Sequence, residues 1–203
     1  MTSKISDKVN PVFDIQGVNH FAIVCKDMKK TVDFYQGLLG MPLIKTCDLP
    51  FGMGQHFFFD IGRGASLAFF WFPEAPEATE GVTVTRTLMG KMGDVTTAVG
   101  SLNHVAFNVD ASRLVEYKAK LEAAGIEVAG MIHHDDTEMG VSFDEPHQST
   151  WVSSIYFKDP DGVQLEFAGW TRAMTAADVK HPAATAADKA KYLEMQKAAP
   201  HPA

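Results

Sequence analysis

The sequence predicts an α+β fold built from two βαβββ modules. Residues 17–46 and 101–130 follow the same order of strand, helix and strand, and each copy opens on an Asn-His pair. Further short segments with strand-like alternation follow each copy. A module of this size cannot cover its own sheet, so we expect the two copies to pack together.

The first module is expected over residues 15–72 and begins with the strand "VNHFAIV". Asp27 is the expected N-cap of an amphipathic helix that ends at Gly40. The segments "QHFFFDIG" and "SLAFFWF" are then expected to add two strands.

The second module is expected over residues 101–170 and begins with "LNHVAFNV". Ser112 is the expected N-cap of its helix, and Gly125 the residue that stops it. The strands "TWVSSIYF" and "VQLEFAGW" follow, joined by a turn at "DPDG", where proline and an Asp-Gly pair favour chain reversal.

Two segments lie outside the modules. Residues 73–100 are rich in Pro, Gly and Thr and predict a long connector, a candidate lid over the sheets. Residues 171–203 are rich in Ala and predict a helical tail interrupted at Pro182.

The composition narrows the class of partner. A net charge of −7 argues against nucleic acid or an anionic membrane as the main partner. The sequence has no apolar run of membrane-spanning length and no apolar signal core in its first ten residues. Its two cysteines form no CxxC pair. We therefore expect a cytoplasmic protein.

Three polar residues stand on the mixed face of otherwise apolar strands: His20, His104 and Glu166. Each alone is typical of an ordinary hydrogen-bonded or solvated strand residue. The two histidines, however, occupy equivalent positions in the repeats, and a buried carboxylate is costly without a partner. Together they predict a divalent metal site with about three open positions, as in non-haem Fe(II) centres.

The paired "NH" strands, "FYQGLLGMPL" and "DPDGVQLEF" resemble the vicinal oxygen chelate superfamily over roughly residues 15–170. That superfamily includes glyoxalase I, bleomycin-resistance proteins, fosfomycin-resistance enzymes and type I extradiol dioxygenases. The resemblance implies that the modules form a curved, partly open mixed β-barrel with flanking helices around one metal. It also implies a homodimer.

Within the superfamily the sequence is most similar to the extradiol dioxygenases. The order His147, Ile155-Tyr156, "DPDG" and Glu166 resembles their signature. This resemblance implies His20, His104 and Glu166 as metal ligands and His147 and Tyr156 as catalytic residues. The fourth, acidic ligand of glyoxalase I falls at or near Ala68. A further histidine of the dioxygenases has no counterpart in "LAFFWFP", and His56, His133 or His134 are the candidate substitutes.

The resemblance therefore predicts an oxidoreductase of aromatic degradation, in which Fe(II) and O2 cleave the ring of a catechol-like substrate. Mn(II), Zn(II), Ni(II) and Co(II) are the alternative metals. Phe70, Trp170 and His56 are expected to contact the substrate, although the aromatic residues suit a hydrophobic core equally well. One alternative is a redox-neutral, metal-dependent isomerase, lyase or epimerase. Another is a metal-free protein that binds a small molecule, against which the three ligand-type residues argue.

Overall fold

The computed structural model describes residue 12 and residues 15–91, 93–143 and 145–198. The chain divides into two compact units. The larger comprises residues 10–173, and the smaller contains the chain from residue 174 onward. Each unit is described by itself.

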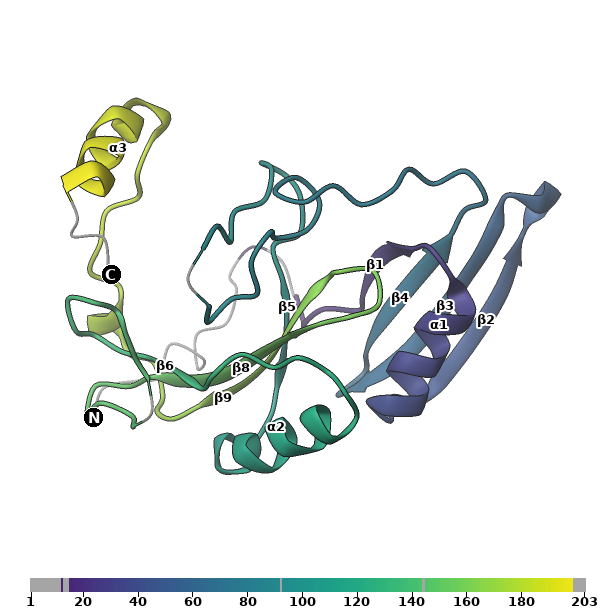
Figure 1. The fold of residues 1–203 in the computed structure, drawn as a ribbon, viewed down its shortest axis with the longest axis horizontal. Coiled ribbons are helices and arrows are strands. Elements are labelled where there is room, and N and C mark those ends of the chain that lie inside the picture. Colours follow the sequence, from purple (N-terminus) through teal and green to yellow (C-terminus); the bar gives the residue numbers. More distant parts are fainter. Residues whose placement is uncertain (1–11, 13–14, 92, 144, 199–203) are drawn as a thin grey trace. The chain divides into compact units, whose positions relative to one another are not determined.

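The first sheet has four strands in the order β1-β4-β3-β2 (Figure 1). β1 runs parallel to β4, and the other neighbours are antiparallel, so the sheet is mixed. The elements are β1 (His20–Cys25), α1 (Met28–Val32), the π-helical η2 (Asp33–Leu38), β2 (Leu43–Leu49), the 3₁₀ turn η3 (Pro50–Gly52), β3 (Gly54–Gly62) and β4 (Ala65–Trp71).

The first helix begins where the sequence predicts. The Asp27 side chain accepts a hydrogen bond from the Lys30 backbone N–H at 3.1 Å, which confirms the N-cap. After one turn the α-helix widens into the π-helix η2. The amphipathic pattern of the sequence predicts a helix here but not the change from α to π geometry. The wider turn buries Phe34 and Tyr35 side by side. Gly40, at φ 71°, follows the end of η2.

The second sheet has five strands in the order β5-β9-β8-β6-β7. β5 is parallel to β9, and the remaining pairs are antiparallel. The elements are β5 (Val105–Asn108), the 3₁₀ turn η4 (Ala111–Arg113), α2 (Leu114–Ala123), β6 (Ile132–His134), β7 (Val141–Phe143), β8 (Val152–Lys158) and β9 (Gln164–Trp170). This sheet has one strand more than the expected module, and its first strand begins at Val105.

The predicted Ser112 cap is wrong. Asp110 takes that place, since its carboxylate accepts from the Ser112 N–H at 2.9 Å and from the Ser112 hydroxyl at 2.8 Å. With its hydroxyl engaged in this way, Ser112 lies inside the turn η4, and α2 begins only at Leu114. Gly125, at φ 79°, follows the end of α2 as expected.

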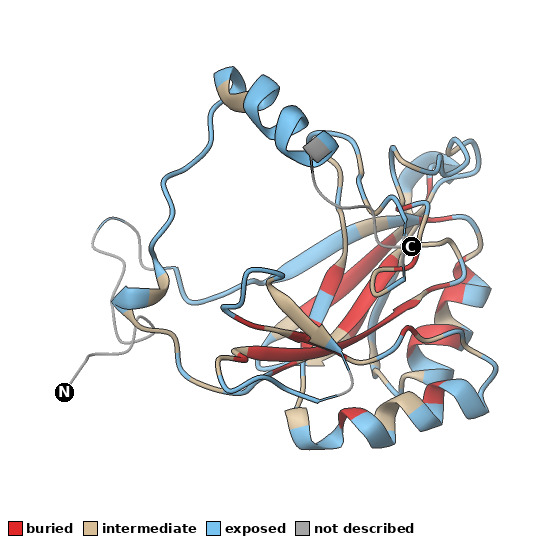
Figure 2. Cartoon of the chain, turned by 60° about the vertical axis from the view of Figure 1, so that its left-hand side comes forward, coloured by how far each residue is buried: buried red, intermediate tan, exposed pale blue. Residues whose placement is uncertain are grey.

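One hydrophobic core is shared by the two modules. α1, η2 and α2 contribute Met28, Tyr35 and Leu114, and the strands contribute residues such as Phe69 and Leu165. Figure 2 shows the buried residues gathered on the strands and on the helices. Because side chains alternate along a strand, Leu165 and Phe167 pack in this core while Glu166 points to the opposite face. His20 has the same relation to Ile23 and Cys25 in β1.

The connector packs against the second sheet. The Met89 N–H donates to the Gln164 side chain at 2.7 Å, and Lys158 donates to the Thr85 carbonyl at 2.8 Å. Leu88 is buried with Ile132 and Tyr156. This part of the connector therefore covers a portion of the face that carries Glu166.

The smaller unit contains the 3₁₀ turns η5 (Ala176–Asp178) and η6 (Ala186–Asp188), followed by α3 (Lys189–Ala198). Each turn starts with a capping box, formed by Thr175 with Asp178 and by Thr185 with Asp188. The short helix agrees with the helical tail expected from the sequence. Among the described residues, no helix is both long and apolar enough to span a membrane.

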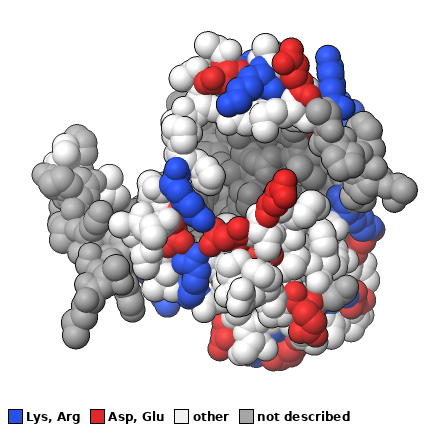
Figure 3. Space-filling view, turned by 90° about the vertical axis from the view of Figure 1, so that its left-hand side faces the viewer, with Lys and Arg blue, Asp and Glu red and all other residues white. Residues whose placement is uncertain are grey.

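The face of the molecule in Figure 3 carries basic and acidic side chains interspersed.

Candidate metal centre and its surroundings

Glu166 has a specific partner in the second sheet. It is buried, and its carboxylate oxygen Oε2 lies 3.1 Å from Nε2 of His104. β5 and β9 are adjacent parallel strands, with Ala106 beside Glu166, so His104 immediately before β5 lies at the same end of the pair. Two of the three predicted ligands are therefore in direct contact.

The orientation of the His104 ring is defined by Asn103. Nδ1 of His104 lies 2.8 Å from the side-chain oxygen of Asn103. The amide nitrogen of Asn103 donates to the Val95 carbonyl at 3.0 Å, so its oxygen must be the atom that faces the ring. That oxygen accepts only, and Nδ1 therefore carries a proton. With Nδ1 engaged in this way, Nε2 is the ring atom that faces the carboxylate, and either a proton on Nε2 or a bound cation between the two groups would satisfy both.

Tyr156 and His134 extend this cluster along the same face. Tyr156 in β8 lies directly opposite Glu166 in β9. Its hydroxyl is 3.1 Å from Nε2 of His134. Burial, followed by the nearby Glu166 charge, raises the pKa of Tyr156, which keeps the phenol protonated. Burial also lowers the pKa of His134, which favours its neutral form at physiological pH.

The pKa of Glu166 reflects competing effects. Burial raises it, but hydrogen bonds from neighbouring side chains, that from His104 first, outweigh burial and leave the net pKa below the ordinary value. The carboxylate is therefore ionised and available as an anionic ligand.

The hydrogen-bond partner of His147 is Ser149, not Tyr156 or Glu166. Its Nδ1 is 2.7 Å from the Ser149 hydroxyl, in the exposed turn before β8. The Tyr156 hydroxyl instead lies within hydrogen-bond distance of His134, one of the three substitutes considered from the sequence, and the Tyr156 ring also packs edge-on against His104. The catalytic role of His147 stays a prediction.

An aromatic face of the first sheet carries His20 and His56. Nδ1 of His20 lies 2.7 Å from the Asn19 side-chain oxygen, which repeats the arrangement in the second module. The His56 ring stacks on Phe70 at 3.6 Å, and Phe58 contacts both histidine rings. Burial, followed by the proximity of His20, lowers the pKa of His56.

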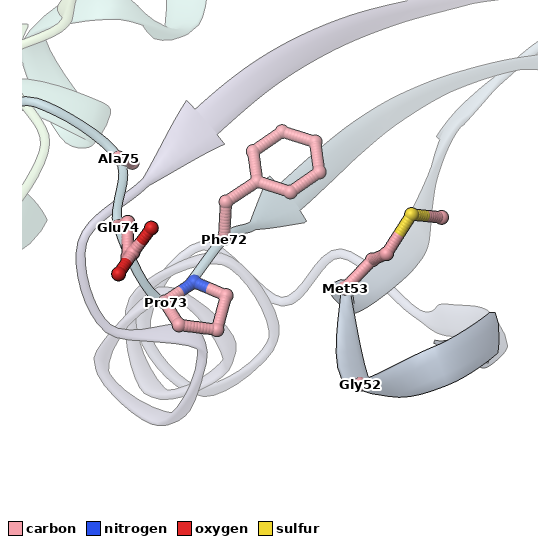
Figure 4. A pocket seen from close by; sticks show the side chains of 6 residues that line it. All are labelled: Gly52, Met53, Phe72, Pro73, Glu74 and Ala75. Atoms are coloured by element: carbon pink, nitrogen blue, oxygen red, sulfur yellow. The ribbon is translucent and has the colours of Figure 1, made fainter.

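A pocket of about 600 Å³ lies at one end of this aromatic face. Phe72, which stacks on Phe70, and Met53 both line it (Figure 4). Trp170 lies at the end of β9 in the other sheet, where it stacks on Trp151 and is 60% exposed. Two of the three predicted substrate contacts, His56 and Phe70, thus occupy one face, and Trp170 belongs to the other sheet.

The three predicted ligands do not all meet in one chain. His104 and Glu166 are in contact, whereas His20 contacts Phe58 in the first sheet. In the part of the chain that the structure describes, no group of three or more His, Cys, Asp or Glu side chains is arranged to hold a metal ion.

The residues present nevertheless suit a divalent cation. Two imidazoles and one carboxylate are a common donor set for ions from Mn(II) to Zn(II). Both histidines direct Nδ1 to an asparagine oxygen, which leaves Nε2 for a ligand, as is usual in metal sites. β4 adds no acidic residue to the face that carries His20, where it presents Ser66, Ala68 and Phe70. The residues present therefore suit a metal ion held by three protein ligands rather than four.

The fold consists of two mixed sheets. In each, a helix follows the first strand, and a histidine that could bind a metal lies at or just before the start of that strand. These features define a glyoxalase-like fold. The model of the Glyoxalase/Bleomycin resistance protein/Dioxygenase superfamily matches residues 17–167, and the chain belongs to that superfamily. The resemblance found in the sequence is thus confirmed, as is the fold of two curved, open mixed sheets.

Individual proteins resemble this chain in sequence or in fold. The chain is 27% identical to "Glyoxylase I 4" of Arabidopsis thaliana over 161 residues, which cover 79% of this chain and 74% of the relative. A glyoxalase family protein from Enterococcus faecalis has a similar fold, with a TM-score of 0.52 and 23% identity over 75% of this chain and 97% of the other. A fosfomycin resistance protein from Listeria monocytogenes gives 0.50 and 22% over 77% and 95%.

Sequence reasoning missed the part played by the asparagines. The Asn-His pair was noted as a marker of the repeat, yet each Asn also contacts the ring of the histidine that follows it. The recurrence of the pair in both modules was the signal that could have revealed this role.

Proposed function

We propose that the protein is a divalent-metal-dependent enzyme that moves a proton on a small substrate with two adjacent oxygens. Its ligands are His20, His104 and Glu166. The contact between Nε2 of His104 and Oε2 of Glu166, at 3.1 Å, is the observation that carries the proposal. In the metal-free chain this contact is a hydrogen bond from the ring to the carboxylate, and a divalent cation bound to both atoms would take the place of that proton.

His20 is proposed to come from a second copy of the chain. The helix-covered sides of both modules share one core, and the connector covers part of the opposite face of the second sheet, whereas the face that carries His20 is left for another molecule to cover. On the first sheet that face is partly apolar and open to solvent, with Val24 47% exposed. A homodimer that places this face over the second sheet of its partner would complete two equivalent centres.

Three protein ligands leave positions for both substrate oxygens. The bound cation would polarise a carbonyl and increase the acidity of the neighbouring C–H bond. Glyoxalase I supplies a fourth, acidic ligand from the first module, and Ala68 cannot provide one. The base in this protein must therefore come from outside the ligand set.

His134 is the proposed base. Its neutral imidazole lies beside the ligand pair, where a lone pair on Nε2 can accept a proton from substrate carbon. Tyr156 stays protonated and can turn its hydroxyl from His134 to a substrate oxygen. When the Tyr156 hydroxyl turns to the substrate oxygen, it would hold the substrate and at the same time leave Nε2 of His134 able to accept a proton. His56 and Phe70 would form one aromatic wall of the site.

Fe(II)-dependent ring cleavage of a catechol by O2 is the second candidate. The order of His147, Tyr156 and Glu166 in the sequence favours it, and Tyr156 does lie beside Glu166. The superfamily includes both glyoxalases and dioxygenases, so membership supports either reaction. Iron and O2 stay predictions.

Two assays separate the candidates. Metal-free protein is reloaded without air with Mn(II), Fe(II), Co(II), Ni(II) or Zn(II) and given α-hydroxycarbonyl compounds in D2O. Incorporation of deuterium at carbon, followed by NMR, is the result expected for proton transfer. If the Fe(II) form alone takes up oxygen with catechols and no deuterium is incorporated, the proposal of proton transfer is wrong and ring cleavage takes its place. A chain that retains none of these metals would refute both.

A further inference from the structure

A relay of hydrogen bonds connects the connector to the candidate ligand pair. The Asn103 amide nitrogen donates to the Val95 carbonyl at 3.0 Å and lies 3.4 Å from the Thr97 hydroxyl. The Asn103 oxygen accepts from Nδ1 of His104 at 2.8 Å, and Nε2 of His104 faces Glu166. Asn103 and His104 thus connect the connector backbone to the carboxylate, with the ring lying between the Asn103 oxygen and Glu166.

The relay has only one consistent arrangement of donors. A backbone carbonyl accepts and cannot donate, so the contact with Val95 identifies the Asn103 atom there as nitrogen. The opposite end of the amide is then an acceptor, and the ring must present Nδ1–H to it. Nε2 is then the ring atom that can give up its proton, and a metal ion would bind there in place of the hydrogen bond to Glu166.

We infer that Asn103, held by connector residues 95–97, is a positioning residue that fixes the tautomer and the direction of the His104 ring. The inference rests on the proposed metal centre for its functional meaning. It gives the connector a second role besides covering the sheet, because displacement of residues 95–97 would release the amide and allow the ring to turn away from Glu166.

Among the described residues, the first module repeats the contact between the asparagine oxygen and the histidine ring but not the contact with the connector. The Asn19 oxygen lies 2.7 Å from Nδ1 of His20, but both side chains are exposed. Asn103 is partly buried and anchored to the connector. Loss of the Asn103 side chain should therefore have a larger effect on its histidine than loss of the Asn19 side chain has on His20.

The first test reads the tautomer in metal-free protein labelled with ¹⁵N at histidine. Long-range ¹H–¹⁵N correlations are recorded at about pH 8, where imidazole is normally neutral. The wild type should show a proton on Nδ1 of His104, and Asn103→Ala should reduce the population that carries it. Asn103→Asp keeps the acceptor and should keep the wild-type tautomer. A wild type without a proton on Nδ1 would overturn the inference even if every variant failed to fold.

The second test measures metal affinity by competition with a chelator, using Mn(II) and Zn(II). Asn103→Ala should weaken binding by about 10–100-fold, as is typical for loss of a group behind a ligand histidine. Asn108→Ala, which removes an exposed amide from β5 itself, is the matched control and should bind as the wild type does. Equal affinity for Asn103→Ala and the wild type would overturn the inference. A wild type that binds no metal would instead refute the proposed function, while the tautomer still tests the relay.

Discussion

The hydroxyl of Tyr35, in the first module, donates a hydrogen bond of 3.0 Å to the carboxylate of Asp159, 124 residues later in the second. Both side chains are buried. The other carboxylate oxygen accepts from the N–H groups of Asp161 and Val163 within the turn that precedes β9. Asp159 therefore joins the two modules and also shapes the turn that leads to Glu166.

This buried carboxyl group should make stability depend on pH. Burial raises the pKa of Asp159 to about 6, against 3.8 for an ordinary aspartate. The folded state thus binds a proton more tightly than the unfolded state, and this contribution to stability is complete below pH 3.8. It is lost as the pH rises through about 6, at a cost of about 3 kcal/mol.

Asp159→Asn should remove that dependence. The amide oxygen can keep the two backbone contacts, and the amide nitrogen can donate to the Tyr35 oxygen. Urea unfolding of both proteins between about pH 4 and pH 7 measures the effect, since other titrating groups cancel in the difference. The unfolding free energy of the wild type should fall relative to that of the variant over this interval. Parallel curves would show that Asp159 is ionised throughout.

Glu166→Gln should abolish retention of a divalent metal. The substitution preserves the shape of the side chain but removes the charge that balances the cation. Metal content after dialysis, measured by mass spectrometry, should fall to background, and Glu122→Gln on the exposed side of α2 should leave it unchanged. Full metal content in Glu166→Gln would remove this residue from the ligand set.

A centre shared between two copies should be restored by mixing defective chains. His20→Ala and Glu166→Ala should each be inactive, because each lacks a ligand in both sites of its homodimer. After co-expression, a mixed dimer contains one site with all three ligands, and about a quarter of the wild-type number of sites should return.

Metal content and turnover of the mixture, compared with each variant alone, provide the measurement. If both variants are defective and the mixture remains at their level, the three ligands belong to one chain or to no common centre. Sedimentation of the mixture confirms that chains have exchanged.

Tyr156→Phe should slow turnover while leaving the metal in place. The phenol is proposed to hold a substrate oxygen, and a hydrogen bond of this kind contributes about 10²-fold or more to the rate when it strengthens in the transition state. Turnover number and metal content are measured on the same preparation, with Tyr117→Phe on α2 as the matched control. An unchanged turnover number would reduce Tyr156 to a packing residue.

The sequence by itself predicted the strand and helix that open each module, the last two strands of each, and the face on which each polar strand residue lies. These follow from short-range rules: strand side chains alternate, Asp27 caps a helix, and "DPDG" turns the chain. The same rules failed at Ser112, whose N–H and hydroxyl both donate to Asp110, and at the π-helix, where Phe34 and Tyr35 are buried side by side.

Contact between residues distant in sequence was decided by the tertiary structure alone. Alternation placed His104 and Glu166 on polar faces, but only the parallel pairing of β5 with β9 brought their side chains to 3.1 Å. It also selected His134 as the neighbour of Tyr156 and joined the helix-covered sides of both modules in one core. The physical reason is that a repeat of two or of 3.6 residues fixes which way a side chain points from its own element, whereas the packing of whole elements fixes what it meets there.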